Sequence, residues 1–177
     1  MIPANIKKKE SIAEYIIFMY QAEDLTKAYD YNLDDILEYV IKHMSSDEAV
    51  IKEQLLWYAD IIEQMKNEDI ANSKKRLHST QIYVDRLTRL HDQLLVTDES
   101  YMGNYAKADK DIRLHINLSE NTIVNPVQIC LNALYGLLLI KLNGKKVSDE
   151  QQTMLANFGS VLEYLSEAYK KEYTLSE

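Results

Sequence analysis

The chain contains 177 residues, of which 46% are hydrophobic and 27% charged, a balance typical of a globular domain large enough to bury a core. Its net charge of −8 at pH 7 argues against nucleic acid and anionic membrane surfaces as partners, because both bind concentrated positive charge. The four glycines and two prolines leave few positions for tight turns, and no segment alternates apolar and polar residues as a half-buried strand does. We therefore expect an all-α protein with a single domain over residues 1–177.

The cysteine content and the apolar runs predict a cytoplasmic protein. The single cysteine, Cys130, excludes an intramolecular disulfide and lies in an apolar segment, so we expect a buried, unreactive thiol. An apolar run at residues 15–20 is too short for a signal peptide and has acidic residues on both sides. The run at residues 133–140 is too short to span a bilayer, so no membrane association is expected.

The first helix is expected over residues 6–29, where apolar side chains recur at the spacing of one helical face. At about 100° per residue, Glu23 falls inside this apolar stripe, beside Ile16 and Met19. A carboxylate in such a position must pair with a cation, accept hydrogen bonds or bind a proton. Glu23 is therefore a candidate buried polar residue.

Capping residues mark the helices in the middle of the chain. Asn32 is expected to cap one helix, and residues 45–48 (SSDE) have the spacing of a capping box that opens the next. Trp57 lies off the apolar seam of that second helix, so it either packs on another neighbour or is partly exposed at an interface. In chain order, these helices are expected at residues 33–44, 48–68 and 73–96, and from 98 through 116.

The least polar segment of the chain covers residues 125–142. Asn125 can cap its free N–H groups, and Pro126 suits a first helical turn. Apolar side chains then point in almost every direction, as in a helix surrounded by protein. We expect this helix to be the central and most buried element of a bundle of six to seven helices. Gly144 is expected to end it, and Ser148 with Gln151 to cap the last helix.

The histidines do not have the spacing of a catalytic or metal site. His43, His78, His91 and His115 form neither a His-x-x-x-His nor a Glu-x-x-His pattern, and only Asp111 lies one turn before a histidine. We expect His91 and His115 to be hydrogen-bonded packing residues. The sequence thus predicts no catalytic residue, no cofactor and no metal ligand, and it argues against an enzyme.

Three polar residues, Gln128, Asn132 and Tyr135, follow one flank of the apolar helix at helical spacing. They admit two interpretations: a polar network that fixes the packing of the bundle, or part of a small-molecule pocket between helices. We expect them to be the first candidates for a partner of Glu23.

Several segments together resemble a known family. They are residues 7–25 (KKKESIAEYIIFMYQAEDL), Trp57-Tyr58, residues 87–94 (LTRLHDQL) and residues 133–140 (ALYGLLLI). The chain is similar over nearly its full length to a family of small all-helical proteins from Bacteroidetes that is known only as a domain of unknown function. This resemblance implies a cytoplasmic all-α protein, and it implies no activity, cofactor or catalytic residue.

The sequence favours a non-catalytic structural or interaction protein that forms a homodimer, with Trp57 and tyrosines at the subunit interface. The alternative is a helical module that binds a small molecule in an inter-helix pocket near Glu23 and the Gln128 flank. An enzyme comes third because an acid–base pair is lacking, and a transcription regulator fourth because no basic recognition helix is present.

Overall fold

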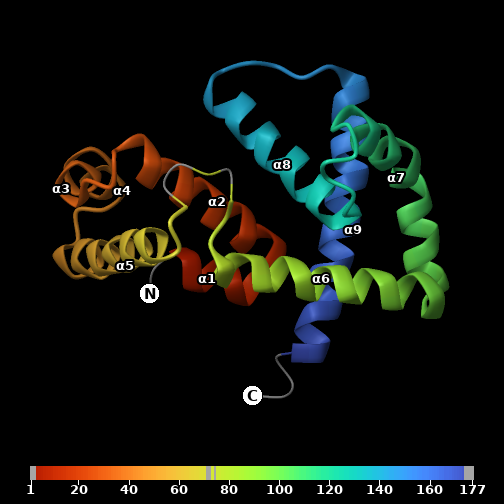
Figure 1. Cartoon of the computed structure of the whole chain (residues 1–177), viewed down its shortest axis with the longest axis horizontal. Helices are drawn as coiled ribbons and strands as arrows, with labels where there is room; N and C mark the ends of the chain where they lie inside the picture. The colour runs from red at the N-terminus through yellow and green to blue at the C-terminus, as the bar shows by residue number, and fades with distance from the viewer. Residues whose placement is uncertain (1–2, 71–72, 74, 174–177) are drawn as a thin grey trace. The chain divides into compact units, whose positions relative to one another are not determined.

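The computed structural model describes residues 3–70, 73 and 75–173, which form helices joined by loops (Figure 1). These described residues contain no β-strand, which confirms the all-α fold class. The elements in chain order are α1 (Pro3–Glu10), α2 (Ile12–Ala28), α3 (Leu33–Ile36), the π-helix η1 (Leu37–Ile41), α4 (Lys42–Met44), α5 (Glu48–Asn67), α6 (His78–Thr97), α7 (Glu99–Leu118), α8 (Pro126–Leu142) and α9 (Asp149–Tyr173).

The chain forms two compact units, and the boundary between them falls inside α6. Unit 1 comprises residues 1–10 and 14–81, and unit 2 comprises residues 11–13 and 82–177. The single domain expected over residues 1–177 stays a prediction.

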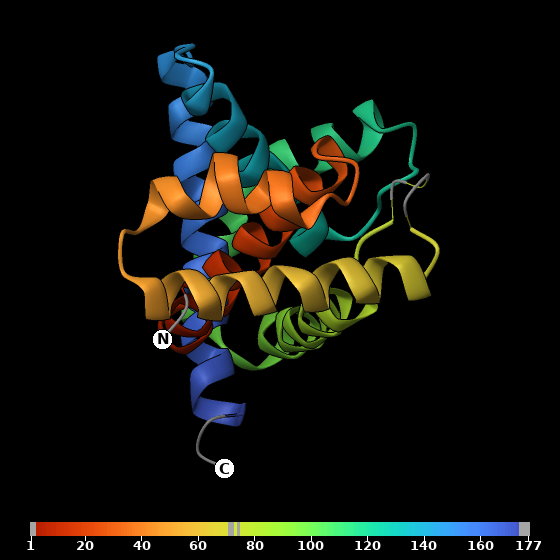
Figure 2. The same cartoon turned by 90° about the vertical axis from the view of Figure 1, so that its left-hand side faces the viewer.

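Unit 1 is built on α5, which packs against α3 and η1; Figure 2 shows these elements side by side. Trp57 is half-buried in this unit, with its ring stacked on Phe18 at a centroid distance of 5.6 Å. The indole therefore packs on a second neighbour, which was one of the two outcomes expected from its place off the α5 seam. A cluster of buried apolar residues in this unit consists of Met19, Ala22, Ile36, Ile41, Tyr58, Ile61, Ile62, Met65, Ile70 and Leu77.

Unit 2 is organised around α9, which packs against both α7 and α8 (Figure 1). The latter two helices also contact each other. A reciprocal capping box starts α9, since the Ser148 N–H donates to Gln151 Oε1 (2.9 Å) and the Gln151 N–H donates to Ser148 Oγ (3.2 Å). The buried face of α9 consists of Leu155, Phe158, Val161, Leu162, Leu165, Ser166 and Tyr169.

The expectation that α8 is the most buried helix is wrong. In its C-terminal half, Leu139 is 39% exposed and Leu142 is 63% exposed. An apolar pattern on every side shows that a helix can be covered all round, but it does not show which sides are covered. The fully buried residues of α8 are Val127, Ile129, Cys130, Leu131 and Tyr135, whereas those of α2 are Ile12, Ala13, Ile16, Met19, Tyr20, Ala22, Glu23 and Thr26.

Two helix boundaries differ from the expected ones. The helix expected over residues 6–29 is interrupted at Ser11, where α1 ends and α2 begins. The backbone N–H of Ala13, in the first turn of α2, donates to Ser166 Oγ of α9 (3.2 Å), so a distant hydroxyl satisfies one free donor of the new helix. The helix expected from residue 73 instead begins at His78.

Candidate functional site

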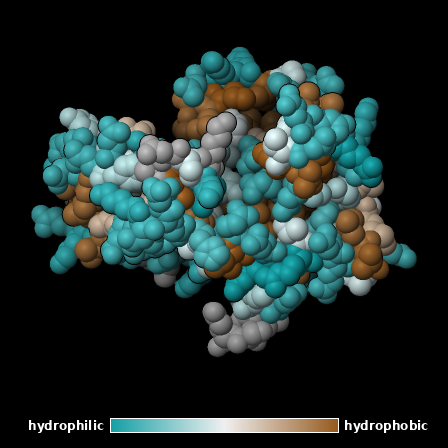
Figure 3. Space-filling view, viewed as in Figure 1, coloured by the Kyte–Doolittle hydropathy of each residue, from teal (hydrophilic) through white to brown (hydrophobic). Residues whose placement is uncertain are grey.

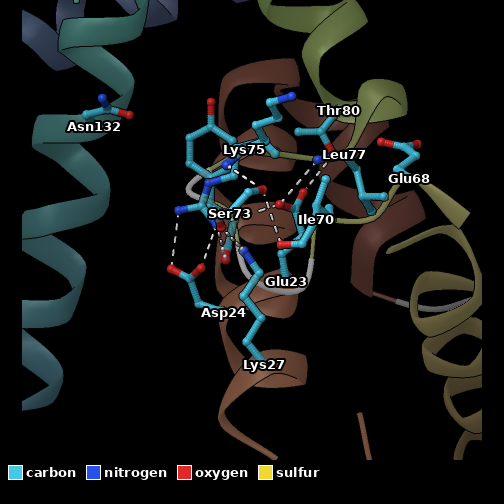
Figure 4. A network of polar contacts seen from close by, with 12 residues as sticks. Glu23, Asp24, Lys27, Glu68, Ile70, Ser73, Lys75, Leu77, Thr80 and Asn132 are labelled. Carbon is cyan, nitrogen blue, oxygen red and sulfur yellow. Dashed lines mark hydrogen bonds and ion pairs between the residues drawn. The ribbon is translucent and has the colours of Figure 1, made fainter. Parts of the chain in front are cut away.

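Glu23 is completely buried in unit 1 and lies against the chain that leads into α6 (Figure 4). The Thr80 hydroxyl donates to Glu23 Oε1 (3.1 Å), and the Leu77 N–H donates to Glu23 Oε2 (3.4 Å). Arg76 Nη1 lies 3.6 Å from the same Oε2. The carboxyl group thus has two hydrogen-bond donors and a nearby cation.

Arg76 holds this segment against α2 through several contacts of its own. Its guanidinium donates to both carboxylate oxygens of Asp24, at 2.6 and 3.2 Å, and to the carbonyl of Tyr20 at 3.3 Å. The guanidinium also lies over the Tyr20 ring, with Arg76 Cζ 4.4 Å from the ring centroid. A bidentate pair of this kind is among the stronger charge-assisted contacts in proteins.

Burial raises the pKa of the Glu23 carboxyl above its ordinary value, and the Arg76 guanidinium and the Thr80 and Leu77 donors offset this only in part. The proton is therefore held more tightly in the folded protein than in the unfolded chain. This environment makes Glu23 a structural anchor for α6 and a proton-binding group.

A second carboxylate accepts a backbone hydrogen bond at the start of α6. The His78 N–H donates to Glu68 Oε2 (2.8 Å), so glutamates from two other parts of the chain accept from the first free N–H groups of this helix. Arg76, Leu77 and Thr80 were not expected as partners of Glu23. No sequence signal identified them, because the helix was expected to begin at residue 73, which hides the free N–H groups at Leu77 and His78.

The predicted flank of α8 is a local polar pair beside a buried tyrosine. Gln128 Nε2 donates to Asn132 Oδ1 (2.8 Å), Asn132 is exposed, and Tyr135 is buried. Glu23 belongs to unit 1 and these three residues to unit 2. Their pairing with Glu23 stays a prediction.

A groove with a volume of about 440 Å³ lies between the end of α7, one face of α8 and the start of α9. No Asp, Glu, Lys or Arg is present among the described residues that line it. We call it the apolar groove. Its lining comprises His115, Leu118, Ser119, Ile123, Ile129, Asn132, Ala133, Gly136, Leu137, Ile140, Val147, Gln151, Met154 and Leu155.

His115 is held in a fixed orientation at this groove. Its Nδ1 lies 2.8 Å from the carbonyl oxygen of Asp111, and its ring meets Phe158 edge-on at 5.7 Å. A carbonyl can only accept, so Nδ1 carries a hydrogen, and in the neutral ring Nε2 is then the acceptor.

A family model described as Domain of unknown function (DUF4924) matches residues 1–175. The chain belongs to this family. The match extends over both units, and it confirms the resemblance to a domain of unknown function. No curated protein and no solved structure matches the chain.

His91, Tyr101 and Cys130 are buried in this member of DUF4924. His91 Nδ1 lies 2.6 Å from the Tyr101 hydroxyl, and burial lowers the pKa of His91 and raises that of Tyr101. Burial raises the pKa of the Cys130 thiol to about 12, so it is not a nucleophile at neutral pH. Within residues 3–70, 73 and 75–173, no group of three or more His, Cys, Asp or Glu side chains could hold a metal ion, and no helix could cross a membrane.

Proposed function

We propose that the protein is a non-catalytic helical interaction protein that forms a homodimer through the apolar groove and the leucines beside it. The observation that carries this proposal is the incomplete burial of α8. This helix is apolar around most of its circumference, yet Leu139 and Leu142 remain exposed and Leu137 and Ile140 are only half-buried. A second protein surface would remove this apolar area from water, at about 25 cal/mol per Å².

Neighbouring apolar side chains extend the same surface. Leu118 lines the groove and is 70% exposed, and Leu114 lies one turn earlier on α7. Val124, in the loop before α8, is exposed as well. Figure 3 shows apolar side chains gathered over α8. Contiguous exposed apolar surface is typical of protein interaction sites.

Charge favours a second copy as the occupant of the groove. Each chain has a net charge of −8, so two copies repel each other unless the surfaces that meet carry no charge. The lining of the apolar groove meets this condition among the described residues. A two-fold dimer also needs a self-complementary surface. Leu118 lines the apolar groove and is largely exposed, so each copy can insert this side chain into the groove of the other.

A small apolar ligand is the second candidate for the same groove. Its volume of about 440 Å³ lies in the range of ligand pockets, about 300–1,000 Å³. His115 Nε2 could accept one hydrogen bond from such a ligand, and the Asn132 amide could donate one.

The proposal places this dimer in the cytoplasm of a bacterium of the Bacteroidetes. The sequence resemblance supports the origin. The single cysteine, which is free and buried, suits a reducing compartment.

Light scattering during gel filtration tests the dimer. At high micromolar concentration we expect a mass of twice the 20.6 kDa of one chain. Leu118→Glu should give a monomer because it places a charge at the apolar contact. Val96→Glu is the matched control, since Val96 is exposed on α6 and does not line the groove, and it should remain dimeric.

A monomeric wild type, or a Leu118→Glu variant that remains dimeric, would contradict the homodimer. Native mass spectrometry of the same samples separates the second candidate. A wild-type monomer that carries an added small-molecule mass, lost on Leu137→Glu, would favour the ligand pocket.

A further inference from the structure

A second groove in unit 2, with a volume of about 620 Å³, lies along α9 beside the end of α6 and the start of α7. Its apolar part comes from Leu90 and Leu94, one turn apart on α6, and from Ala168 on α9. We call it the acidic groove. The remaining residues that line it are Gln93, Asp98, Asn104, Ser160, Glu163, Tyr164, Glu167, Lys171 and Glu172.

Two parallel rows of α9 residues shape this groove. Tyr164 and Ala168 are half-buried and lie four residues apart, so they follow one another along the helix. Glu163 and Glu167 form the adjacent row and are exposed. An apolar row beside a charged row is the surface that a second helix recognises when its ridge packs into the groove.

The lining of the groove carries a net negative charge. Asp98, Glu163, Glu167 and Glu172 supply carboxylates, and Lys171 supplies the one ammonium among the lining residues. Glu167 also pairs with Lys170, whose Nζ lies 2.7 Å from Glu167 Oε1, so a partner's cation would compete with Lys170 at this position. The Tyr101 N–H and the Tyr164 hydroxyl lower the pKa of Asp98, so this carboxylate is ionised at neutral pH.

We propose that the acidic groove binds a basic amphipathic helix from a protein partner. Apolar side chains of that helix would pack on the half-buried Leu94 and Ala168, and Lys or Arg side chains on its flanks would face Glu163 and Glu167. The α9 residues that line the groove run from Ser160 to Glu172, about 18 Å of helix at about 1.5 Å per residue, so a partner helix of about 12 residues fits.

Charge complementarity selects this occupant. A second copy of the chain has a net charge of −8 and is repelled by the carboxylates, whereas a basic helix is attracted to them. Glu163 makes no hydrogen bond or ion pair with any described residue, so it is free to pair with a partner's cation.

The test uses a fluorescein-labelled helical peptide of about 14 residues, built from Leu at three- and four-residue spacing with Lys on both flanks. We expect it to bind the full chain, and the double variant Glu163→Gln with Glu167→Gln to weaken binding about tenfold in fluorescence anisotropy. The control, Glu63→Gln with Glu150→Gln, changes the net charge equally at exposed positions outside the groove and should leave the affinity nearly unchanged.

A third variant tests the apolar part without changing charge. Ala168→Phe fills the groove and should also weaken binding about tenfold, by steric exclusion. Equal weakening in the groove variant and its charge-matched control would overturn the proposal, because it would indicate general attraction to an acidic protein. Full binding by Ala168→Phe, no binding by the wild type, or binding of spermine in place of the peptide with the same dependence on Glu163 and Glu167, would overturn it as well.

Discussion

Glu23 performs the function of a helix cap from a distance of more than 50 residues along the chain. The chain enters α6 at Leu77, which has no side-chain oxygen, and the Glu23 carboxyl accepts its N–H and the Thr80 hydroxyl. A buried carboxyl group is tolerated here because each oxygen has a donor and Arg76 lies nearby. The same contacts fix the segment before α6 against α2.

Removal of this carboxyl group should destabilise the fold. Glu23→Ala leaves two buried donors without an acceptor, so we expect the free energy of unfolding to fall by about 1–3 kcal/mol. Glu23→Gln keeps the shape and one acceptor oxygen and should lose less. Urea titrations measure both changes, with Glu14→Ala as an exposed control on the same helix. An unchanged midpoint for Glu23→Ala would contradict the anchoring role.

The raised pKa of Glu23 makes its contribution depend on pH. Since the folded protein holds the proton more tightly than the unfolded chain, this group stabilises the fold at acidic pH, and that stabilisation is lost as the pH rises from about 4.5 through the folded-state pKa. Glu23→Gln does not titrate. We therefore expect the urea midpoint of the wild type, relative to that of Glu23→Gln, to decrease as the pH rises above about 4.5.

Carboxylates far from Glu23 are present unchanged in both proteins, so their contributions to the midpoint cancel in this comparison. A difference between the two midpoints that stays constant over the same pH range would contradict a raised pKa for Glu23.

At the scale of the helix, a substitution at Gly136 tests whether a second copy packs on α8. A Cβ atom built on Gly136 meets nothing within 4 Å, and the same is true of Gly103 on α7. Gly→Ala at either position should therefore stabilise the fold by about 0.5–1 kcal/mol through helix propensity. Gly136 lines the apolar groove and Gly103 does not.

If a second copy packs closely on α8, Gly136→Ala should weaken the dimer although it stabilises each chain, whereas Gly103→Ala should leave the dimer unchanged. Sedimentation equilibrium measures the dimer constant, and thermal unfolding measures the fold. Equal dimer dissociation constants for the two variants would show that Gly136 is not part of the subunit contact.

Local and distant caps explain which helix boundaries the sequence could predict. Asn32 and Asn125 accept backbone N–H groups two and three residues ahead, and both helix starts were predicted correctly. The start of α6 was missed because its acceptors, Glu23 and Glu68, are distant in sequence. The break at Ser11 was missed for the same reason, since Ser166 satisfies the first turn of α2.

The candidate site was predictable only in part. Helical spacing alone marked Glu23 as buried, and Glu23 has no exposed surface. The partners of Glu23 come from a segment that the sequence assigned to a helix, so they could not be identified. Periodicity also identified α8 as apolar all round but could not show that Leu139 and Leu142 stay exposed.

At the scale of the whole molecule, association of two chains would make stability depend on concentration. A dimer that is more stable than its separated chains is favoured by mass action, so its melting temperature rises with protein concentration. We expect the wild-type melting temperature to increase between about 5 μM and about 200 μM. Leu118→Glu, in which a charge replaces an exposed leucine of the groove, should melt at one temperature over this range, while Val96→Glu should behave as the wild type does. If the transition is reversible and the wild-type melting temperature does not depend on concentration, the homodimer is contradicted. The apolar groove of unit 2 would then be open to solvent or to another kind of ligand.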